Sequence, residues 1–234
     1  MPSMIRPDEL SQRAAALTTS GLSDAMDRLG IRGQVAGVHA IGTARSLCGP
    51  AYTVRYRPVQ ATGETVGDFI DDVPAGTVVV IDNQGRSDCT VWGDILTETA
   101  HLRELAGTVI DGICRDAQAC DDVNYPLFAR ANWMRTGKDR VAIDAVGGPV
   151  TIGDVRVAPG DLVVGDRDGV VILPTGRIAN IVELAEEIEA AEQRIRLAVR
   201  SGERLDAARA TTGYHELQRQ INAGSGGTSD QERK

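Results

Sequence analysis

Three short apolar runs, separated by segments of helical character, constrain the fold of this 234-residue chain more than any other feature. The runs span residues 77–82, 107–113 and 126–131, and continuous apolar runs are typical of strands buried on both faces. Helices are predicted between them at 92–105 and 116–123. Strands that alternate with helices form parallel sheets with helical crossovers. The middle of the chain therefore predicts an α/β fold.

The flanking segments are predicted from periodicity and from turn residues. In the first part of the chain we expect helix in the first 33 residues, with Ser20 or Ser23 as cap, and then β structure over 35–57. A short helix is expected at 67–73 and a polar loop at 83–90. Toward the carboxyl terminus we expect a long amphipathic helix at 175–200, preceded by antiparallel β segments at 150–152, 155–157, 162–164 and 170–173. We expect one α/β domain over 1–203. Residues 204–234 are expected to form a helical extension and a disordered tail.

Charge and composition exclude several classes of function. The formal net charge is −8 and the pI is about 5.0, which disfavours nucleic acid or an anionic membrane as partner. No apolar run approaches the ~20 residues of a membrane span, and the first residues lack a secretory signal. The four cysteines lack C-x2-C spacing, so we expect reduced thiols in a cytoplasmic protein and no structural zinc.

Lysine is nearly absent from the chain, which bears on the kind of chemistry available. Of the 25 basic residues, only Lys138 and the terminal Lys234 are lysines. A Schiff-base enzyme needs a buried lysine with a lowered pKa. Lys138 lies in a polar stretch that is typical of a turn. Covalent amine catalysis is therefore not expected.

Asp94, Arg115 and Asp116 are the candidate catalytic group. Asp94 stands at the start of a predicted helix, and the other two residues follow a predicted strand. Twenty residues, enough for one helix, a turn and one strand, separate Asp94 from Arg115. The three side chains are therefore expected to converge at the carboxyl ends of the strands, where open α/β sheets bind their ligands.

These residue types suit a small keto acid and a divalent metal. The Arg115 guanidinium matches a carboxylate bidentately, and the amides of Ile95 and Leu96 point out of a helix N-terminus toward an anion. Asp94 and Asp116 offer the oxygen ligands that Mg²⁺ prefers. A metal bound by a 2-keto acid stabilises an enolate without any lysine. The alternative is structural, since Arg-Asp after a strand is common and Asp94 could act only as a helix cap.

Glu192 interrupts the expected apolar stripe of the long carboxyl-terminal helix. The stripe runs through Ile181, Ala185, Ile188, position 192 and Ile195. A buried carboxylate is costly unless it is paired or hydrated. Glu192 is therefore expected either to reach water near the helix end or to face a polar site.

The chain resembles the RraA-like family, which includes the 4-hydroxy-4-methyl-2-oxoglutarate / 4-carboxy-4-hydroxy-2-oxoadipate aldolases. The matching stretches are 22–30 (Leu-Ser-Asp-Ala-Met-Asp-Arg-Leu-Gly), 49–54 (Gly-Pro-Ala-Tyr-Thr-Val), 92–96 (Trp-Gly-Asp-Ile-Leu), 109–116 (Val-Ile-Asp-Gly-Ile-Cys-Arg-Asp), 159–166 (Pro-Gly-Asp-Leu-Val-Val-Gly-Asp) and 168–171 (Asp-Gly-Val-Val). The motif of an Asp, twenty residues and Arg-Asp resembles the aldolase branch. The regulator branch, which inhibits ribonuclease E, generally lacks the acid after the arginine.

The resemblance implies a β/β/α swivelling-domain fold, trimers or hexamers, and Mg²⁺ or Mn²⁺ at the subunit interface. It implies that Asp116 binds the metal, that Asp94 holds metal-bound water, and that Arg115 binds substrate with the amides of Ile95 and Leu96. A glutamate of the neighbouring subunit's last helix would complete the outer shell, and Glu192 is the matching residue.

The implied activity is retro-aldol cleavage of a 4-hydroxy-2-keto acid, decarboxylation of oxaloacetate, or both. The alternatives are a non-catalytic regulatory protein and a lyase of a specialised pathway with another keto acid. Residues 83–88 and 132–135 depart from the family pattern, which leaves the substrate open.

Overall fold

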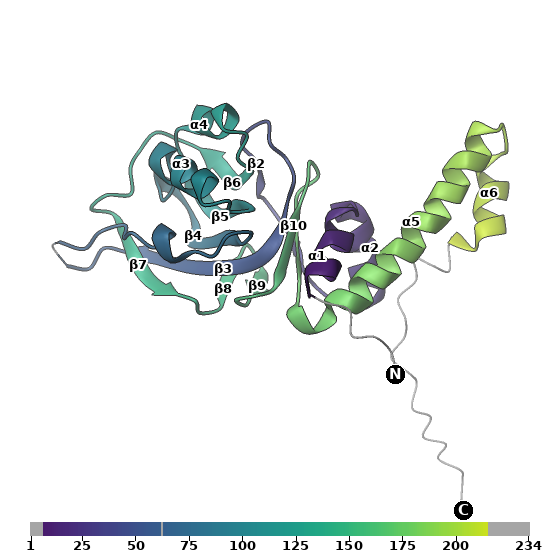
Figure 1. The fold of residues 1–234 in the computed structure, drawn as a ribbon, viewed down its shortest axis with the longest axis horizontal. Coiled ribbons are helices and arrows are strands. Elements are labelled where there is room, and N and C mark those ends of the chain that lie inside the picture. The colour runs from purple at the N-terminus through teal and green to yellow at the C-terminus, as the bar shows by residue number, and fades with distance from the viewer. Residues whose placement is uncertain (1–6, 62, 215–234) are drawn as a thin grey trace, which may run out of the picture.

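A nine-stranded sheet organises the fold, in a computed structural model that describes residues 7–61 and 63–214. Figure 1 shows the sheet and its helices on one side of the molecule and the long helix α5 leaving it on the other. The elements are α1 (Pro7–Ala15), α2 (Thr19–Arg28), β1 (Gln34–Val35), β2 (His39–Ala40), β3 (Leu47–Pro58), η1 (Ile70–Asp72), β4 (Val78–Thr90), α3 (Asp94–Leu102), β5 (Gly107–Cys114), α4 (Ala117–Asp122), β6 (Leu127–Asn132), β7 (Val141–Val146), β8 (Val150–Ile152), β9 (Val155–Val157), β10 (Leu162–Gly165), β11 (Val170–Leu173), η2 (Thr175–Arg177), α5 (Ile178–Arg200) and α6 (Leu205–Thr212).

The centre of the sheet is parallel. Its strand order is β1-β11-β10-β3-β4-β5-β6-β2, and β7 pairs with β3 outside this path. The neighbours β3, β4, β5 and β6 run parallel, whereas the outer pairings are antiparallel. The predicted parallel α/β core is therefore confirmed. The loops that follow β4 and β5 reach the same edge of the sheet, because parallel strands end on the same side.

Each face of the parallel strands packs against a different layer. On one face, side chains such as Ile81 and Ile110 contact residues of α3 and α4, including Ala100 and Cys120. On the other face, Val80 and its neighbours contact the antiparallel β8–β9 hairpin. Both layers remove apolar surface from water, which explains why the central strands are apolar throughout.

A third apolar cluster joins the carboxyl-terminal helix to the sheet. Leu22 and Met26 of α2 pack with Ile181 and Ala185 of α5 against β10 and β11. This helical layer lies beyond β10 in Figure 1, away from α3 and α4. Among the described residues, no helix is both long enough and apolar enough to cross a membrane.

Several predicted elements differ from the structure. The segment 83–90 is not a loop, because β4 continues through it and pairs with β5 across two bulges. Neither Ser20 nor Ser23 caps α2. Thr18 does so, because its side chain accepts a hydrogen bond from Gly21 N.

Other expectations are confirmed or fall outside the described part. The short β segments at 150–152, 155–157, 162–164 and 170–173 are strands, and the long helix is present. Within 204–214 the helix α6 forms, where a helical extension is expected, and the expected disordered tail lies outside the described residues. The single domain over 1–203 stays a prediction.

Candidate functional site

The start of α3 holds Asp94 at the carboxyl edge of the sheet. Gly93 is the extended residue before the helix, and its carbonyl accepts hydrogen bonds from both the amide and the hydroxyl of Thr97, each 3.0 Å long. The same hydroxyl accepts a 2.9 Å hydrogen bond from the Trp92 indole. The indole stacks on Tyr125 with ring centroids 6.3 Å apart. Buried groups therefore fix the first turn that carries Asp94.

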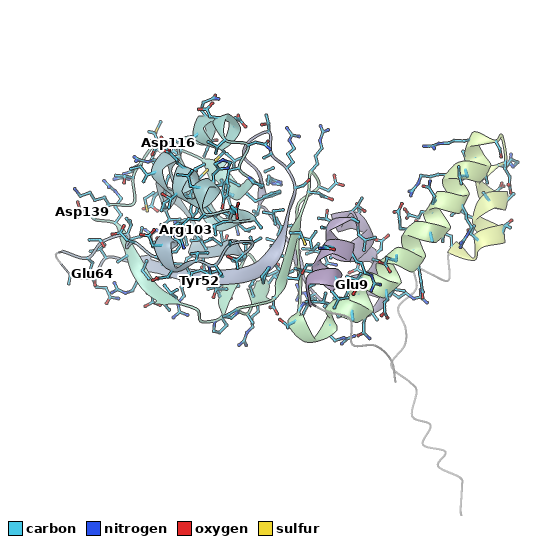
Figure 2. The ribbon with its side chains drawn as sticks, in the orientation of Figure 1. Glu9, Tyr52, Glu64, Arg103, Asp116 and Asp139 are labelled. Atoms are coloured by element: carbon cyan, nitrogen blue, oxygen red, sulfur yellow. The ribbon has the colours of Figure 1, made fainter. Side chains whose placement is uncertain are left out.

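Arg115 and Asp116 come directly after β5. The Arg115 amide donates a 3.0 Å hydrogen bond to the Trp92 carbonyl, which ties the two segments together. Asp116 adopts a left-handed conformation with φ of 57° immediately before α4. This unusual backbone turns the chain sharply at the strand end. Figure 2 shows Asp116 in the region of α3 and α4.

The structure brings Asp94, Arg115 and Asp116 together as the spacing predicts. Arg115 Nε lies 3.1 Å from Asp116 Oδ2. The same carboxylate oxygen accepts a 3.3 Å hydrogen bond from the amide of Asp94. The Arg115 and Asp116 side chains are about two-fifths exposed, at 40% and 39%. The ion pair is therefore open to a ligand from solvent.

Gly93 leaves the space that this ion pair needs. A Cβ atom at this position would lie 2.8 Å from Asp116 Oδ2 and 3.1 Å from Arg115 Nε. Contacts below 3.0 Å force neighbouring atoms to shift. Gly93 thus allows the start of α3 to approach the Arg115–Asp116 pair closely.

A pocket of about 230 Å³ opens over Gly93, Asp94 and Arg115, and Asp116 lies beside it through its ion pair with Arg115. Its lining residues are Val66, Gly67, Asp68, Thr90, Val91, Trp92, Gly93, Asp94, Ile95, Leu96, Arg115, Thr136 and Gly137. The sequence predictions missed Asp68, Thr90 and Thr136. These residues come from three separate segments, and no spacing motif links them to Asp94.

The two predicted anion-binding amides differ in availability. The amide of Ile95 donates to Asp94 Oδ1 at 2.9 Å. The amide of Leu96 has no acceptor among the described residues. The side chain of Ile95 is exposed, at 74%, and so is that of Leu102. Thr97 and Ala100 are the buried positions of α3.

The donor set is compatible with a divalent metal that keeps most of its waters. Within residues 7–61 and 63–214, no group of three or more His, Cys, Asp or Glu side chains is placed to hold an ion. Asp94 and Asp116 each retain one carboxylate oxygen, Oδ2 and Oδ1 respectively, that no described residue hydrogen-bonds. Mg²⁺ is commonly held by one or two carboxylates with water and substrate completing its shell. The residues present therefore fit such an ion.

Neighbouring thiols are poor candidates for a nucleophile. Burial raises the pKa of Cys114 to about 12 and also raises the pKa of Cys120. All four cysteines are free in the structure. Because the thiolate is the reactive form, these side chains remain neutral near pH 7 and serve as packing groups.

Glu192 does not lie at this pocket within its own chain. It sits beside the buried stripe of α5, because Ala191 occupies the buried position. Its carboxylate pairs with Arg196 at 3.1 Å and accepts a 2.9 Å hydrogen bond from the Tyr214 hydroxyl. The stripe expected from the sequence is confirmed at Ile181, Ala185, Ile188 and Ile195 and is wrong only at position 192. The placement of Glu192 beside the pocket of a neighbouring subunit stays a prediction.

Comparison with known proteins identifies the relatives of this chain. A family model described as RraA-like (Aldolase/RraA) matches residues 19–172. A protein of Halalkalibacterium halodurans named "Putative 4-hydroxy-4-methyl-2-oxoglutarate aldolase" is 32% identical over 76% of this chain and 82% of its own length. Protein DlpA of Legionella pneumophila is 37% identical over 86% of this chain. The match covers 33% of DlpA, so the chain spans about a third of that protein's length.

A solved structure supports the same relationship. The crystal structure of an uncharacterized protein from Pseudomonas syringae has a TM-score of 0.82 and 40% identity. The match covers 88% of this chain and all of that one. The family model and these relatives agree with the mixed α/β fold and its long carboxyl-terminal helix, and the chain belongs to the RraA-like family.

Proposed function

We propose that this chain is a divalent-metal-dependent carbon–carbon lyase. It would release pyruvate from a 4-hydroxy-2-keto acid, decarboxylate oxaloacetate, or do both. The observation that carries the proposal is a pocket lined by Asp94 and Arg115, with Asp116 held beside it because its carboxylate contacts both Arg115 and the amide of Asp94. A relative of similar length bears an aldolase name.

Asp116 and Asp94 would hold Mg²⁺ or Mn²⁺, Asp94 through water. The bound ion would act as a Lewis acid on the 2-keto group and stabilise the negative charge that develops there. Arg115 binds and orients the substrate carboxylate and the keto oxygen through its planar set of donors. The amide of Leu96 is free to add a hydrogen bond to an anionic oxygen. No covalent amine is required, in line with the scarcity of lysine.

A second copy of the chain would complete the site. Glu192 lies on a helix that leaves the body of the sheet, where it can reach a neighbouring molecule. In a trimer or hexamer its carboxylate would sit in the outer shell of the metal and hold a water.

The decisive experiment is a metal-supplemented assay. Purified protein with Mg²⁺ or Mn²⁺ is given a panel of 4-hydroxy-2-keto acids and oxaloacetate, and pyruvate is measured with a coupled dehydrogenase. We expect turnover that excess EDTA abolishes and that added metal restores. Undiminished turnover in EDTA, or borohydride trapping of substrate on Lys138, would contradict the proposal.

The panel also tests the non-catalytic alternative. A protein that binds the metal yet turns over no member of the panel would favour a regulatory role, as in the other branch of the family. Turnover of a single unusual keto acid would favour a specialised lyase with the same chemistry.

A further inference from the structure

A single buried hydroxyl group contacts the three chain segments that carry the site residues. It belongs to Thr97 of α3, which is 1% exposed. The hydroxyl lies 3.0 Å from the carbonyl oxygen of Gly93, the residue directly before Asp94. It also lies 2.9 Å from the indole nitrogen of Trp92 and 3.7 Å from the thiol of Cys120. The chemistry of these three neighbours determines the direction of each hydrogen bond.

The three contacts use the full hydrogen-bonding capacity of the hydroxyl. A hydroxyl group has one proton to donate and two lone pairs that accept. A carbonyl only accepts and an indole N–H only donates, so the proton of Thr97 goes to Gly93 and one lone pair faces Trp92. The second lone pair accepts from the thiol of Cys120, which stays protonated because burial raises its pKa. Valine has the same shape and can make none of these bonds, whereas serine can make all three.

Two of these neighbours are tied in turn to the other site residues. The backbone carbonyl of Trp92 accepts a 3.0 Å hydrogen bond from the amide of Arg115. Cys120 belongs to α4, which begins directly after Asp116. The buried hydroxyl therefore joins the segments of Asp94, Arg115 and Asp116 from inside the protein. These contacts lie within one chain, whether or not a second copy covers the pocket.

We propose that Thr97 is a positioning residue that sets the placement of Asp94 relative to Asp116. The inference rests on the proposed function, in which both aspartates hold the metal. Mg²⁺ requires near-ideal octahedral geometry, so a small shift of one carboxylate weakens its binding. The 3.3 Å contact between the Asp94 amide and Asp116 Oδ2 depends on where the first turn of α3 begins. Thr97 is outside the pocket lining and acts through Gly93 and α4.

The test compares Thr97→Val with Thr97→Ser in the full-length protein. Binding of Mn²⁺ is measured by EPR spectroscopy without substrate, so this readout does not depend on turnover. We expect Thr97→Val to raise the Kd for Mn²⁺ by about 10-fold, as for other changes that support metal ligands indirectly. At saturating Mn²⁺ its kcat should fall by about 10-fold, because the reacting groups are misplaced. Thr97→Ser keeps the hydroxyl and should stay within about threefold of the wild type in both measurements.

Thr53→Val is the matched control. Thr53 is also 1% exposed, and its hydroxyl donates a 2.6 Å hydrogen bond to the Gly148 carbonyl, outside the pocket lining. Both valine variants lose one buried threonine hydroxyl, so the urea midpoint should fall in both. Affinity for Mn²⁺ and kcat should fall in Thr97→Val alone. Trp92→Phe keeps an aromatic ring but removes the donor to Thr97, and we expect it to raise the Kd for Mn²⁺ as well.

The outcomes separate this inference from the proposed function. Wild-type affinity for Mn²⁺ in folded Thr97→Val, an equal loss in Thr53→Val, or no rescue by Thr97→Ser would overturn the inference while the lyase activity stands. If Thr97→Val does not fold, Trp92→Phe decides in the same way. A wild-type protein that neither binds Mn²⁺ nor releases pyruvate from any keto acid of the panel would instead remove the proposed function itself.

Discussion

Two groups of acid and arginine side chains lie at the carboxyl ends of the parallel strands, and they differ in how completely their charges are paired. The first group lies on the face covered by the β8–β9 hairpin and contains Asp82, Asp111 and Arg130. Asp82 and Asp111 are opposite one another on β4 and β5 and are 8% and 5% exposed. The second group is Asp94, Arg115 and Asp116 at the pocket.

Every carboxylate oxygen of the first group has a partner. Asp82 accepts hydrogen bonds from the amides of Gln84 and Thr151. Asp111 accepts one from Gly153 N at 3.0 Å and another from the Arg130 side chain. These bonds attach the hairpin to the strand ends. A group of this kind has no unpaired carboxylate oxygen for a ligand, and its hydrogen bonds stabilise the fold.

The second group keeps unused binding capacity. Asp94 and Asp116 each have an oxygen without a partner among the described residues, and Arg115 spends only Nε on Asp116. Residue type alone does not separate the two groups, since both combine two aspartates with one arginine. The two groups differ in how many of their polar atoms are paired and in their exposure, and a ligand can bind only where polar atoms are unpaired and exposed.

The strongest test of the comparison removes Asp111. Asp111→Ala should lower the free energy of unfolding by about 1–3 kcal/mol, because it leaves the amide of Gly153 without its acceptor and removes the ion pair with the partly exposed Arg130. Urea unfolding measures this loss. Asp111→Asn keeps one acceptor and should cost less. The activity per folded molecule should be unchanged, and a loss below ~1 kcal/mol would show that the pairing matters little.

Substitution of Arg115 should lower activity and leave stability nearly unchanged, the opposite of the result expected for Asp111. Arg115→Lys should lower kcat by about 10²-fold or more, nearly as much as Arg115→Ala, because an ammonium cannot present two parallel donors. The free energy of unfolding should change by less than ~0.5 kcal/mol, as is usual for exposed positions. Steady-state kinetics and urea unfolding of the same samples provide both numbers. A lysine variant with near-native kinetics would place Arg115 with the structural group.

Substitutions of Glu192 test whether a second chain completes the site formed by Asp94, Arg115 and Asp116. Glu192→Gln should weaken metal binding or turnover by about 10- to 100-fold, the usual range for outer-shell changes. Inactive Glu192→Ala subunits mixed with inactive Asp116→Ala subunits should regain partial activity. Light scattering should show a trimer or hexamer. A monomer, or exchange of subunits without any recovery, would confine the site to one chain.

The smallest effect is expected at the Arg57–Glu64 pair, whose side chains are only partly buried. Hydrogen bonds from Arg57 hold the pKa of Glu64 at about 2. Because the folded pKa is depressed, the stabilisation is present above about 4.5 and is lost as the pH falls through about 2. Surface pairing contributes little to the free energy of unfolding. Titration by NMR should place the Glu64 midpoint near 2, and Arg57→Gln should return it toward 4.5.

The apolar strands were predictable because burial on both faces leaves a continuous run in the sequence. Residues 78–82 and 107–113 are strands as expected. The extension of β4 through 83–90 was not predictable, because this segment is polar and pairs with β5 only across two bulges. The strand β7 was likewise not identified, since it pairs only along the end of β3.

The site was predictable only as far as the chain geometry reaches. The return of a helix and a strand to one sheet edge placed Asp94 near Arg115. Asp68 and Thr136 come from segments whose positions depend on tertiary contacts. Glu192 was expected on the buried stripe of its helix because positions 191 and 192 both fit the helical spacing from Ile188, and the buried one is Ala191.

The packing of α2 on α5 has a consequence for folding during synthesis on the ribosome. Leu22 meets Ile181 in the same apolar cluster, and 158 residues separate them in the sequence. Proteins are synthesised from the amino terminus at about 5–20 residues per second. The apolar side of α2 therefore waits for roughly 8–30 seconds before its partner helix has been translated. During that interval the apolar side of α2 lacks the cover that α5 gives it in the folded protein.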